Sequence, residues 1–140
     1  MILYAESSAV LAWLLGESEA ESVRGVLAAA GVVFASRLTI AECERGLARL
    51  EALGVLPSSD TVVLRETLGR AASHWIRYDI GASILARVGQ AFPAEPVRTL
   101  DAIHLATALE LRSAEPRLEV LTLDQRVRAN AGQLEMPVHP

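Results

Sequence analysis

The sequence predicts an α/β fold in which a mostly parallel β-sheet is covered by helices on both faces. Short runs of apolar and β-branched residues alternate along the chain with longer segments whose apolar residues recur at helical spacing. Serine or aspartate precedes several of the helical segments, and glycine ends others, as at the ends of helices. Strands that alternate with helices in this way form parallel sheets with helices on both faces.

The predicted elements follow one another closely, without a linker long enough to separate two domains. We therefore expect a single domain over residues 1–140. The expected strands are residues 2–5, 32–36, 74–78, 119–123 and a short edge strand within 136–140. The expected helices are residues 7–15, 17–31, 37–53, 59–72, 80–92, 98–111 and 124–131, with Ser7 or Ser8 as N-cap of the first and Asp79 of the fifth.

The composition argues against two classes of protein. Although 51% of the residues are hydrophobic, no uncharged run reaches the ~18 residues that a bilayer span needs, so we do not expect a membrane protein. The N-terminus lacks a basic segment, and the only cysteine, Cys43, cannot form an internal disulfide; both facts favour the cytoplasm. The net charge of −4 argues against nucleic-acid binding through bulk positive charge, so a polyanion must be held locally.

Four carboxylates lie in or beside apolar, structured segments: Glu6, Glu42, Asp101 and Asp124. Glu6 follows the first predicted strand, and Asp124 follows the fourth. The carboxyl ends of parallel strands share one edge of the sheet, where ligand sites form. Glu42 and Asp101 lie in the second and first turns of their helices, so all four acids are candidates for one site.

Each acid also has a purely structural interpretation. Asp101 and Asp124 suit the N-terminal ends of helices, where a carboxylate accepts backbone N–H bonds. Glu42 could pair with Arg45 on the exposed face of its helix. Glu6 is the hardest to explain as a cap, because the two serines that follow it are the more natural caps. If all four acids have structural roles, the chain is an unrelated α/β binding domain.

Together, the four acids predict a metal site. Two unit charges about 4 Å apart repel by roughly 4 kcal/mol at an effective dielectric of 20, so protons or a divalent cation must compensate the cluster. Oxygen ligands without histidine or cysteine favour Mg²⁺ or Mn²⁺. Such an ion activates water and offsets charge on the leaving oxygen in phosphodiester hydrolysis. The acids therefore point to metal-assisted phosphodiester hydrolysis.

The order of these motifs resembles that of the PIN domain family, from Met1 to about Ala131. Within the family, the chain is most similar to the VapC-type toxins of prokaryotic toxin–antitoxin pairs. The most specific motif is LDAIHLATA followed by a strand and T-x-D. The motifs that carry the resemblance are YAESS, LTIAECERGL, RTLDAIHLATAL and LTLD.

The resemblance implies a three-layer α/β/α sandwich around a mostly parallel sheet, with an acidic Mg²⁺ or Mn²⁺ site that cleaves RNA. It assigns catalytic positions to Glu6, Glu42, Asp101 and Asp124, of which Glu6, Asp101 and Asp124 would bind the metal. It assigns supporting positions to Ser8, which would hydrogen-bond the first acid, and Thr122, which would line the site. It also implies a homodimer and an antitoxin of the VapB type whose tail covers the active-site groove.

The first acid departs from the family pattern, which ordinarily has aspartate there. Glu6 keeps the carboxylate but extends it by one methylene, about 1.5 Å of extra reach. A misplacement of about 1 Å can cost on the order of a hundredfold in rate. We expect reduced activity more than none, and the alternative is an attenuated or inactive PIN module that binds RNA or a protein partner.

Several further features allow more than one interpretation. His104 shares a helix face with Asp101, which suggests a metal ligand, but a packed or surface histidine is the default. For Cys43, the default is a small residue of the core. Arg45 and Arg49 could guide RNA or meet an acidic partner, or could simply form a solvated face with ion pairs. The apolar helix over residues 7–15 could be covered by a second chain, by an antitoxin or by the chain's own core.

Overall fold

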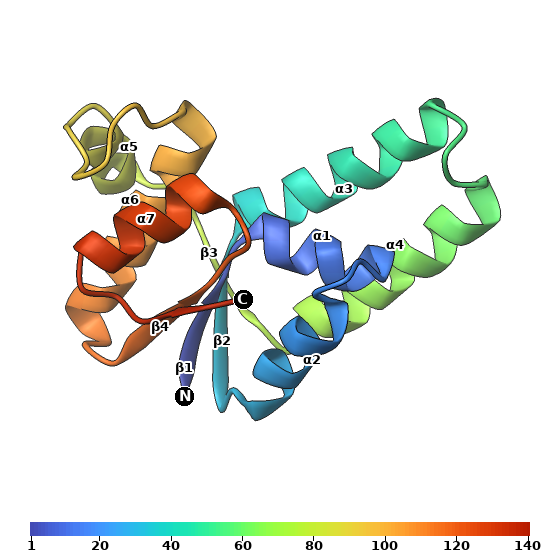
Figure 1. Ribbon diagram of the computed structural model, residues 1–140, viewed down its shortest axis with the longest axis horizontal. Helices are drawn as coiled ribbons and strands as arrows, with labels where there is room; N and C mark the ends of the chain where they lie inside the picture. Colours follow the sequence, from blue (N-terminus) through green and yellow to red (C-terminus); the bar gives the residue numbers. More distant parts are fainter.

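The computed structural model describes residues 1–140 and has a five-stranded parallel sheet at its centre (Figure 1). The strands run in the spatial order β3-β2-β1-β4-β5, and every neighbouring pair is parallel. The predicted parallel sheet is therefore confirmed. The strands are β1 (Ile2–Ala5), β2 (Val32–Ser36), β3 (Ile76–Tyr78), β4 (Leu118–Leu121) and β5 (Val138–His139).

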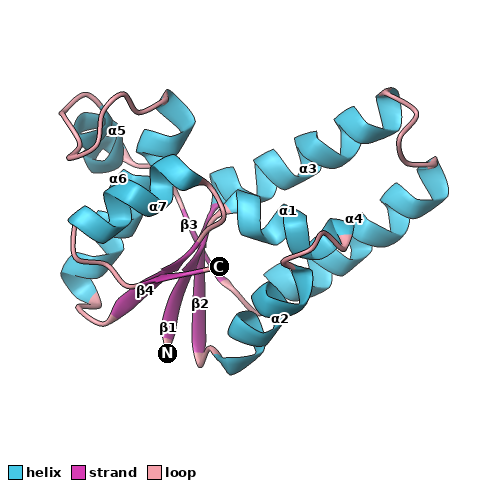
Figure 2. Ribbon diagram, viewed as in Figure 1, coloured by secondary structure: helices cyan, strands magenta, loops and turns pink.

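Helices cover both faces of the sheet and complete the expected three-layer α/β/α sandwich (Figure 2). Four lie on one side: α1 (Ser7–Leu15), α2 (Ala20–Ala29), α3 (Arg37–Ala52) and α4 (Ser58–Ala72). Three lie on the other: α5 (Ala82–Val88), α6 (Thr99–Ala114) and α7 (Gln125–Gln133). The pair α3 and α4 projects well beyond the sheet as an antiparallel hairpin (Figure 1). None of the helices is both long and apolar enough to cross a membrane.

The strand order reverses between β1 and β4, at the centre of the sheet. The chain first moves outward from β1 through β2 to β3, then crosses the sheet to β4 and continues to β5. Tyr4 pairs with Val120 across this junction, and the Glu6 N–H donates to the Leu121 carbonyl at 3.0 Å just beyond the strand ends. Open α/β sheets bind their ligands at the carboxyl ends of strands at such a switch point.

Alternate residues of β1 pack into opposite layers, which explains its unbroken apolar sequence. Tyr4 packs with the α5–α7 layer, whereas Leu3 and Ala5 pack with α1 and α2.

Cys43 is fully buried in the layer of α1 to α4, so the sequence prediction of a small core residue is confirmed. At Gly46 of α3, an added Cβ would lie 3.1 Å from the Leu11 side chain, so glycine allows α1 and α3 to approach closely.

The structure corrects several predicted boundaries between α4 and α6. The expected strand over 74–78 is confined to β3, because turns at 73–75 follow α4. The expected helix over 80–92 is shorter and begins after Gly81, with no side-chain cap. Asp79 is therefore not an N-cap, and its carboxylate instead pairs with Arg37 at the start of α3. A local sequence pattern suggested a cap, but a partner 42 residues away binds the carboxylate.

Candidate active site

The four acids identified from the sequence all lie at the carboxyl edge of the sheet. Glu6 directly follows β1, and Asp124 lies three residues after the end of β4, its sheet neighbour. Glu42 comes from the second turn of α3 and Asp101 from the first turn of α6, and these helices belong to opposite layers. The site is therefore built across the sheet, from both helical layers and two central strands.

Glu6 is buried, with 3% of the residue exposed, and it is the N-cap of α1. Its Oε2 accepts hydrogen bonds from the Ser8 N–H at 3.1 Å, from the Ser8 hydroxyl and from the Thr122 hydroxyl at 2.8 Å. Its Oε1 accepts a bond from the Ser7 hydroxyl at 2.7 Å. The prediction that Ser7 or Ser8 caps this helix is wrong, because Ser7 is already helical and the longer Glu6 side chain folds back onto the Ser8 N–H.

Ser8 and Thr122 connect Glu6 to Asp124. The Ser8 hydroxyl donates to Glu6 and accepts the N–H groups of Leu123 at 2.9 Å and Asp124 at 3.0 Å. Thr122 likewise donates to Glu6 and accepts the Asp124 N–H at 3.1 Å. These two hydroxyls fix the backbone at the end of β4 relative to the carboxylate at the end of β1.

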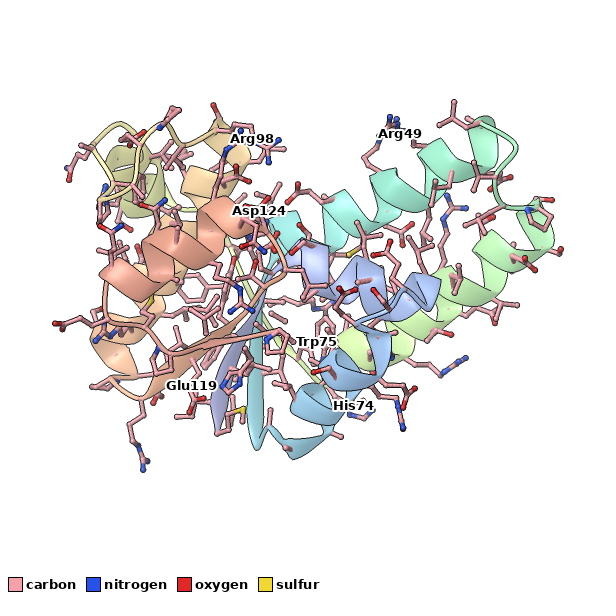
Figure 3. All side chains as sticks on the ribbon, viewed as in Figure 1. Arg49, His74, Trp75, Arg98, Glu119 and Asp124 are labelled. Carbon is pink, nitrogen blue, oxygen red and sulfur yellow. The ribbon has the colours of Figure 1, made fainter.

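Arg98 joins Asp124 to Asp101, and Figure 3 labels Arg98 and Asp124 at the same end of the molecule. Its Nε lies 2.8 Å from Asp101 Oδ2, and its Nη2 lies 3.5 Å from Asp124 Oδ2. Asp124 Oδ1 also caps α7 by accepting the N–H groups of Arg126 and Val127. Asp101 makes no such cap, because α6 begins without a side-chain cap bond. Of the two proposed caps, the structure contains only that of Asp124.

Glu42 contacts histidine in place of the arginine suggested by the sequence. The nearest polar atom to its Oε1 is His104 Nε2 at 2.6 Å, and the Ser7 hydroxyl donates to the same oxygen at 3.0 Å. No ion pair forms between Glu42 and Arg45. Ser7 therefore lies between Glu6 and Glu42 and completes a network that contains all four acids.

Sequence reasoning did not select Arg98, Ser7 or His104 as residues of this site, and His104 is the most buried of the three. Its ring is 1% exposed, and its Nδ1 lies 2.7 Å from the hydroxyl of Tyr4 on β1. Its Nε2 faces Glu42 and also lies 3.6 Å from Glu6 Oε1. The available signal was its spacing of three residues from Asp101, which places both on one face of α6. The partner Tyr4 is 100 residues away and could not be found from spacing alone.

Burial, hydrogen bonds and charge shift the pKa of four groups near the site. The hydrogen bond to Asp101 and the charge of Asp101 raise the pKa of Arg98, so its guanidinium stays charged. Burial raises the pKa of Glu42, but the hydrogen bond and charge of His104 and the bond from Ser7 outweigh it, so the pKa lies below its ordinary value. Burial and the Glu6 charge raise the pKa of Tyr4 far above its ordinary value, so the phenol stays protonated. Burial raises the pKa of the Cys43 thiol to about 12, which excludes a thiolate ligand at neutral pH.

Two adjoining pockets open beside this network and share Glu42 and Leu100. One has a volume of about 230 Å³ and is lined by Glu42, Arg98, Thr99, Leu100 and Asp101. The other has a volume of about 350 Å³ and is lined by Ala41, Glu42, Arg45, Gly46, Arg49 and Leu100. Arg45 and Arg49 are exposed and form no ion pair, so their guanidinium groups are free beside the acids; Figure 3 shows Arg49 on α3.

The side chains of this network fit a divalent cation. Carboxylate oxygens of Glu6 and Glu42 lie within 4.8 Å of each other, a spacing that one ion can bridge, and a ring nitrogen of His104 lies within the same distance of both. Most of the available donors are carboxylate oxygens, which suit Mg²⁺ or Mn²⁺. Asp101 and Asp124 lie outside this closest group and share the Arg98 guanidinium, whose side chain is 64% exposed and free to move aside.

The parallel α/β/α sandwich with four acids gathered at its central switch point is the arrangement that the resemblance to the PIN domain family implies. The comparison with known families agrees. The chain belongs to the PIN domain family, which matches residues 3–134.

One relative is similar to the chain in sequence, and two solved structures are similar to it in fold. The chain is 33% identical over 136 residues to "Ribonuclease VapC46" of Mycobacterium tuberculosis, covering 97% of this chain and 95% of the relative. VapBC2 from Rickettsia felis, solved with a promoter DNA fragment, has a TM-score of 0.68 at 14% identity and covers 99% of this chain and 98% of that chain. A toxin–antitoxin complex from Klebsiella pneumoniae has a TM-score of 0.63 at 20% identity, covering 92% and 91%.

Proposed function

We propose that the protein is a metal-dependent endoribonuclease and the toxin of a toxin–antitoxin pair, hydrolysing RNA phosphodiester bonds. The observation that carries this proposal is the network of four carboxylates at the β1–β4 switch point. Membership of the PIN domain family and a relative named as a ribonuclease support the nuclease activity. The same site and the same family make Mg²⁺ or Mn²⁺ the proposed cofactor.

The family resemblance supplies the proposed metal ligands, and contacts in the structure support the role of each acid. Glu6, Asp101 and Asp124 would hold the cation, which supplies water activation and charge neutralisation at the phosphate. Glu6 and Asp124 are fixed by hydroxyl and backbone donors, so their oxygens need little reorganisation. Glu42 borders both pockets, and its lowered pKa keeps it ionised at neutral pH, which suits it to orient the attacking water as a hydrogen-bond acceptor.

The proposed RNA path runs over the pockets beside Glu42. Arg45 and Arg49 are exposed cations one helical turn apart on α3, and Arg98 lies on the α6 side. Guanidinium groups bind phosphate oxygens well, and they hold a strand without reading its bases. This local positive charge would allow a chain with net charge −4 to bind a polyanion.

The proposed partners are an antitoxin of the VapB type and a second copy of the chain. Toxin–antitoxin complexes among the structural neighbours support the antitoxin. Most of α1 is covered by the chain's own core, but Leu14 and Leu15 border a pocket of about 320 Å³ with Leu56, Val63 and Leu64. The homodimer, the single domain over residues 1–140 and the cytoplasmic location remain proposals by family resemblance and composition.

The contacts of Glu6 lend no support to the non-catalytic alternative. Its longer side chain leaves the carboxylate within the network, bonded to Ser7, Ser8 and Thr122. The extra methylene is accommodated by folding back over the start of α1. We therefore retain the active enzyme as the proposal, and these contacts give no reason to expect that the extra methylene lowers its activity.

The proposal is tested by incubating the purified protein with tRNAs and ribosomal RNA in Mn²⁺, Mg²⁺ or EDTA. We expect cleavage that needs the metal and is lost in Asp101→Asn, which keeps the side-chain shape and removes one negative charge. Asp60→Asn, at an exposed position on α4, is the matched control and should cleave normally. If every RNA of the panel stays intact while calorimetry shows bound Mn²⁺, the proposed ribonuclease activity is contradicted. Growth arrest on expression, relieved by a small protein encoded next to the gene, tests the toxin role.

A further inference from the structure

Glu42 has fewer fixed hydrogen-bond donors than Glu6 or Asp124. It projects from a helix, its side chain is 27% exposed, and no backbone N–H donates to it. Its partners are the hydroxyl of Ser7 and the ring of His104. The single Ser7 proton is shared with Glu6, which lies closer, at 2.7 Å against 3.0 Å. His104 is therefore the main group that fixes Glu42.

The geometry also fixes which nitrogen of His104 carries a proton. An ionised carboxylate can only accept, so the 2.6 Å contact requires a proton on Nε2. The other nitrogen, Nδ1, lies 2.7 Å from the Tyr4 hydroxyl, which donates to it when the ring is neutral. Tyr4 is fully buried in the central strand. Two successive hydrogen bonds thus connect Tyr4 on β1 to the Glu42 carboxylate on α3.

We propose that Tyr4 and His104 are positioning residues that hold Glu42 in the orientation that cleavage needs. The effect on RNA cleavage that we expect from this positioning rests on the proposed function. An imidazole with a proton on Nε2 has no lone pair there for a cation, so His104 acts on Glu42 and is not itself a metal ligand. The close grouping of Glu6, Glu42 and His104 then reflects a histidine that supports the acids.

The protonated nitrogen can be identified in metal-free protein by ¹⁵N NMR of the imidazole rings. Only three histidines are present, and His104→Gln assigns the resonance. We expect a proton on Nε2 that exchanges slowly with water, and a lower Nε2–H population in Tyr4→Phe. A neutral ring with its proton on Nδ1 in the wild-type protein would overturn the proposal.

Two substitutions of His104 separate donation from metal binding. Glutamine places an amide N–H₂ near the position of Nε2, whereas leucine fills the space without a donor. We expect His104→Leu to lower kcat about 10- to 100-fold with little change in KM, and His104→Gln to recover most of the rate. Mn²⁺ affinity by calorimetry should be retained in His104→Gln. His74→Gln, at an exposed position far from the site in Figure 3, is the matched control.

The alternative outcomes are distinct. If His104→Gln and His104→Leu lose Mn²⁺ affinity equally, and pulsed EPR of the Mn²⁺-loaded wild type detects nitrogen coupling from histidine, His104 is a metal ligand and the proposal fails. Full kcat in a folded His104→Leu protein also overturns it. If the wild type binds Mn²⁺ but cleaves no RNA, the proposed function fails, while the NMR result still decides whether His104 holds Glu42.

Discussion

The two carboxylate oxygens of Asp124 have separate tasks, and a pair of substitutions can distinguish them. Oδ1 accepts the Arg126 and Val127 N–H groups at 2.8 and 3.0 Å and caps α7. Oδ2 faces Arg98 and is the oxygen available to a cation. Asp124→Asn keeps an oxygen for the cap and loses the charge, whereas Asp124→Ala loses both.

The size of the stability effect follows from the cap. Replacing a capping aspartate by alanine costs ~1 kcal/mol, whereas asparagine caps about as well as aspartate. At an entropy of unfolding of roughly 0.3 kcal/mol/K for a chain of this length, alanine should lower the Tm by about 3 °C. We expect asparagine to stay within about 1 °C of the wild type, because the Arg98 contact it also weakens is long and exposed.

Thermal unfolding without metal, Mn²⁺ calorimetry and RNA cleavage should be measured on all three proteins. We expect both variants to lose Mn²⁺ affinity and cleavage, but only Asp124→Ala to lose stability. An asparagine variant that melts as low as the alanine variant would refute the division between the two oxygens. An asparagine variant that binds Mn²⁺ as tightly as the wild type would refute the metal role of Asp124.

Three further perturbations test other parts of the site. Glu6→Asp should lower the free energy of unfolding by about 1 kcal/mol and should not raise cleavage, because the shorter side chain gives up hydroxyl donors; a large gain in rate would instead indicate that Glu6 attenuates the enzyme. Arg98→Ala should strengthen Mn²⁺ binding in calorimetry, because it frees Asp101 and Asp124 from the guanidinium, and should raise the KM for RNA by up to about fivefold. Weaker Mn²⁺ binding would contradict the position of Arg98 between the two aspartates. The folded pKa of Glu42 lies below 4.5, so its contribution to stability is present above that pH and is lost as the pH falls through the folded value. Glu42→Gln should therefore flatten the dependence of Tm on pH below about 4.5, and an unchanged slope would contradict the lowered pKa.

The fold could be predicted because its signals are local. The alternation of strands and helices, with Glu6 and Asp124 directly after two strands, places both acids at one edge as soon as the sheet is parallel. Local signals failed where a distant partner competed for a side chain. Asp79 looked like a cap but pairs with Arg37, and Glu42 looked like the partner of Arg45 but bonds His104. Spacing along one helix shows which residues are neighbours on that helix, and it contains no information about the helix packed opposite.

The extra methylene of Glu6 has a structural meaning that the sequence did not reveal. An aspartate at this N-cap would reach the Ser8 N–H with its short side chain, as capping aspartates do. Glu6 makes the same cap through Oε2 and extends its other oxygen toward Ser7, within 3.6 Å of His104 Nε2. The first acid thereby contacts the hydroxyl that also binds Glu42. The longer side chain couples the acid after β1 to the acid on α3, so the position of each carboxylate depends on the other.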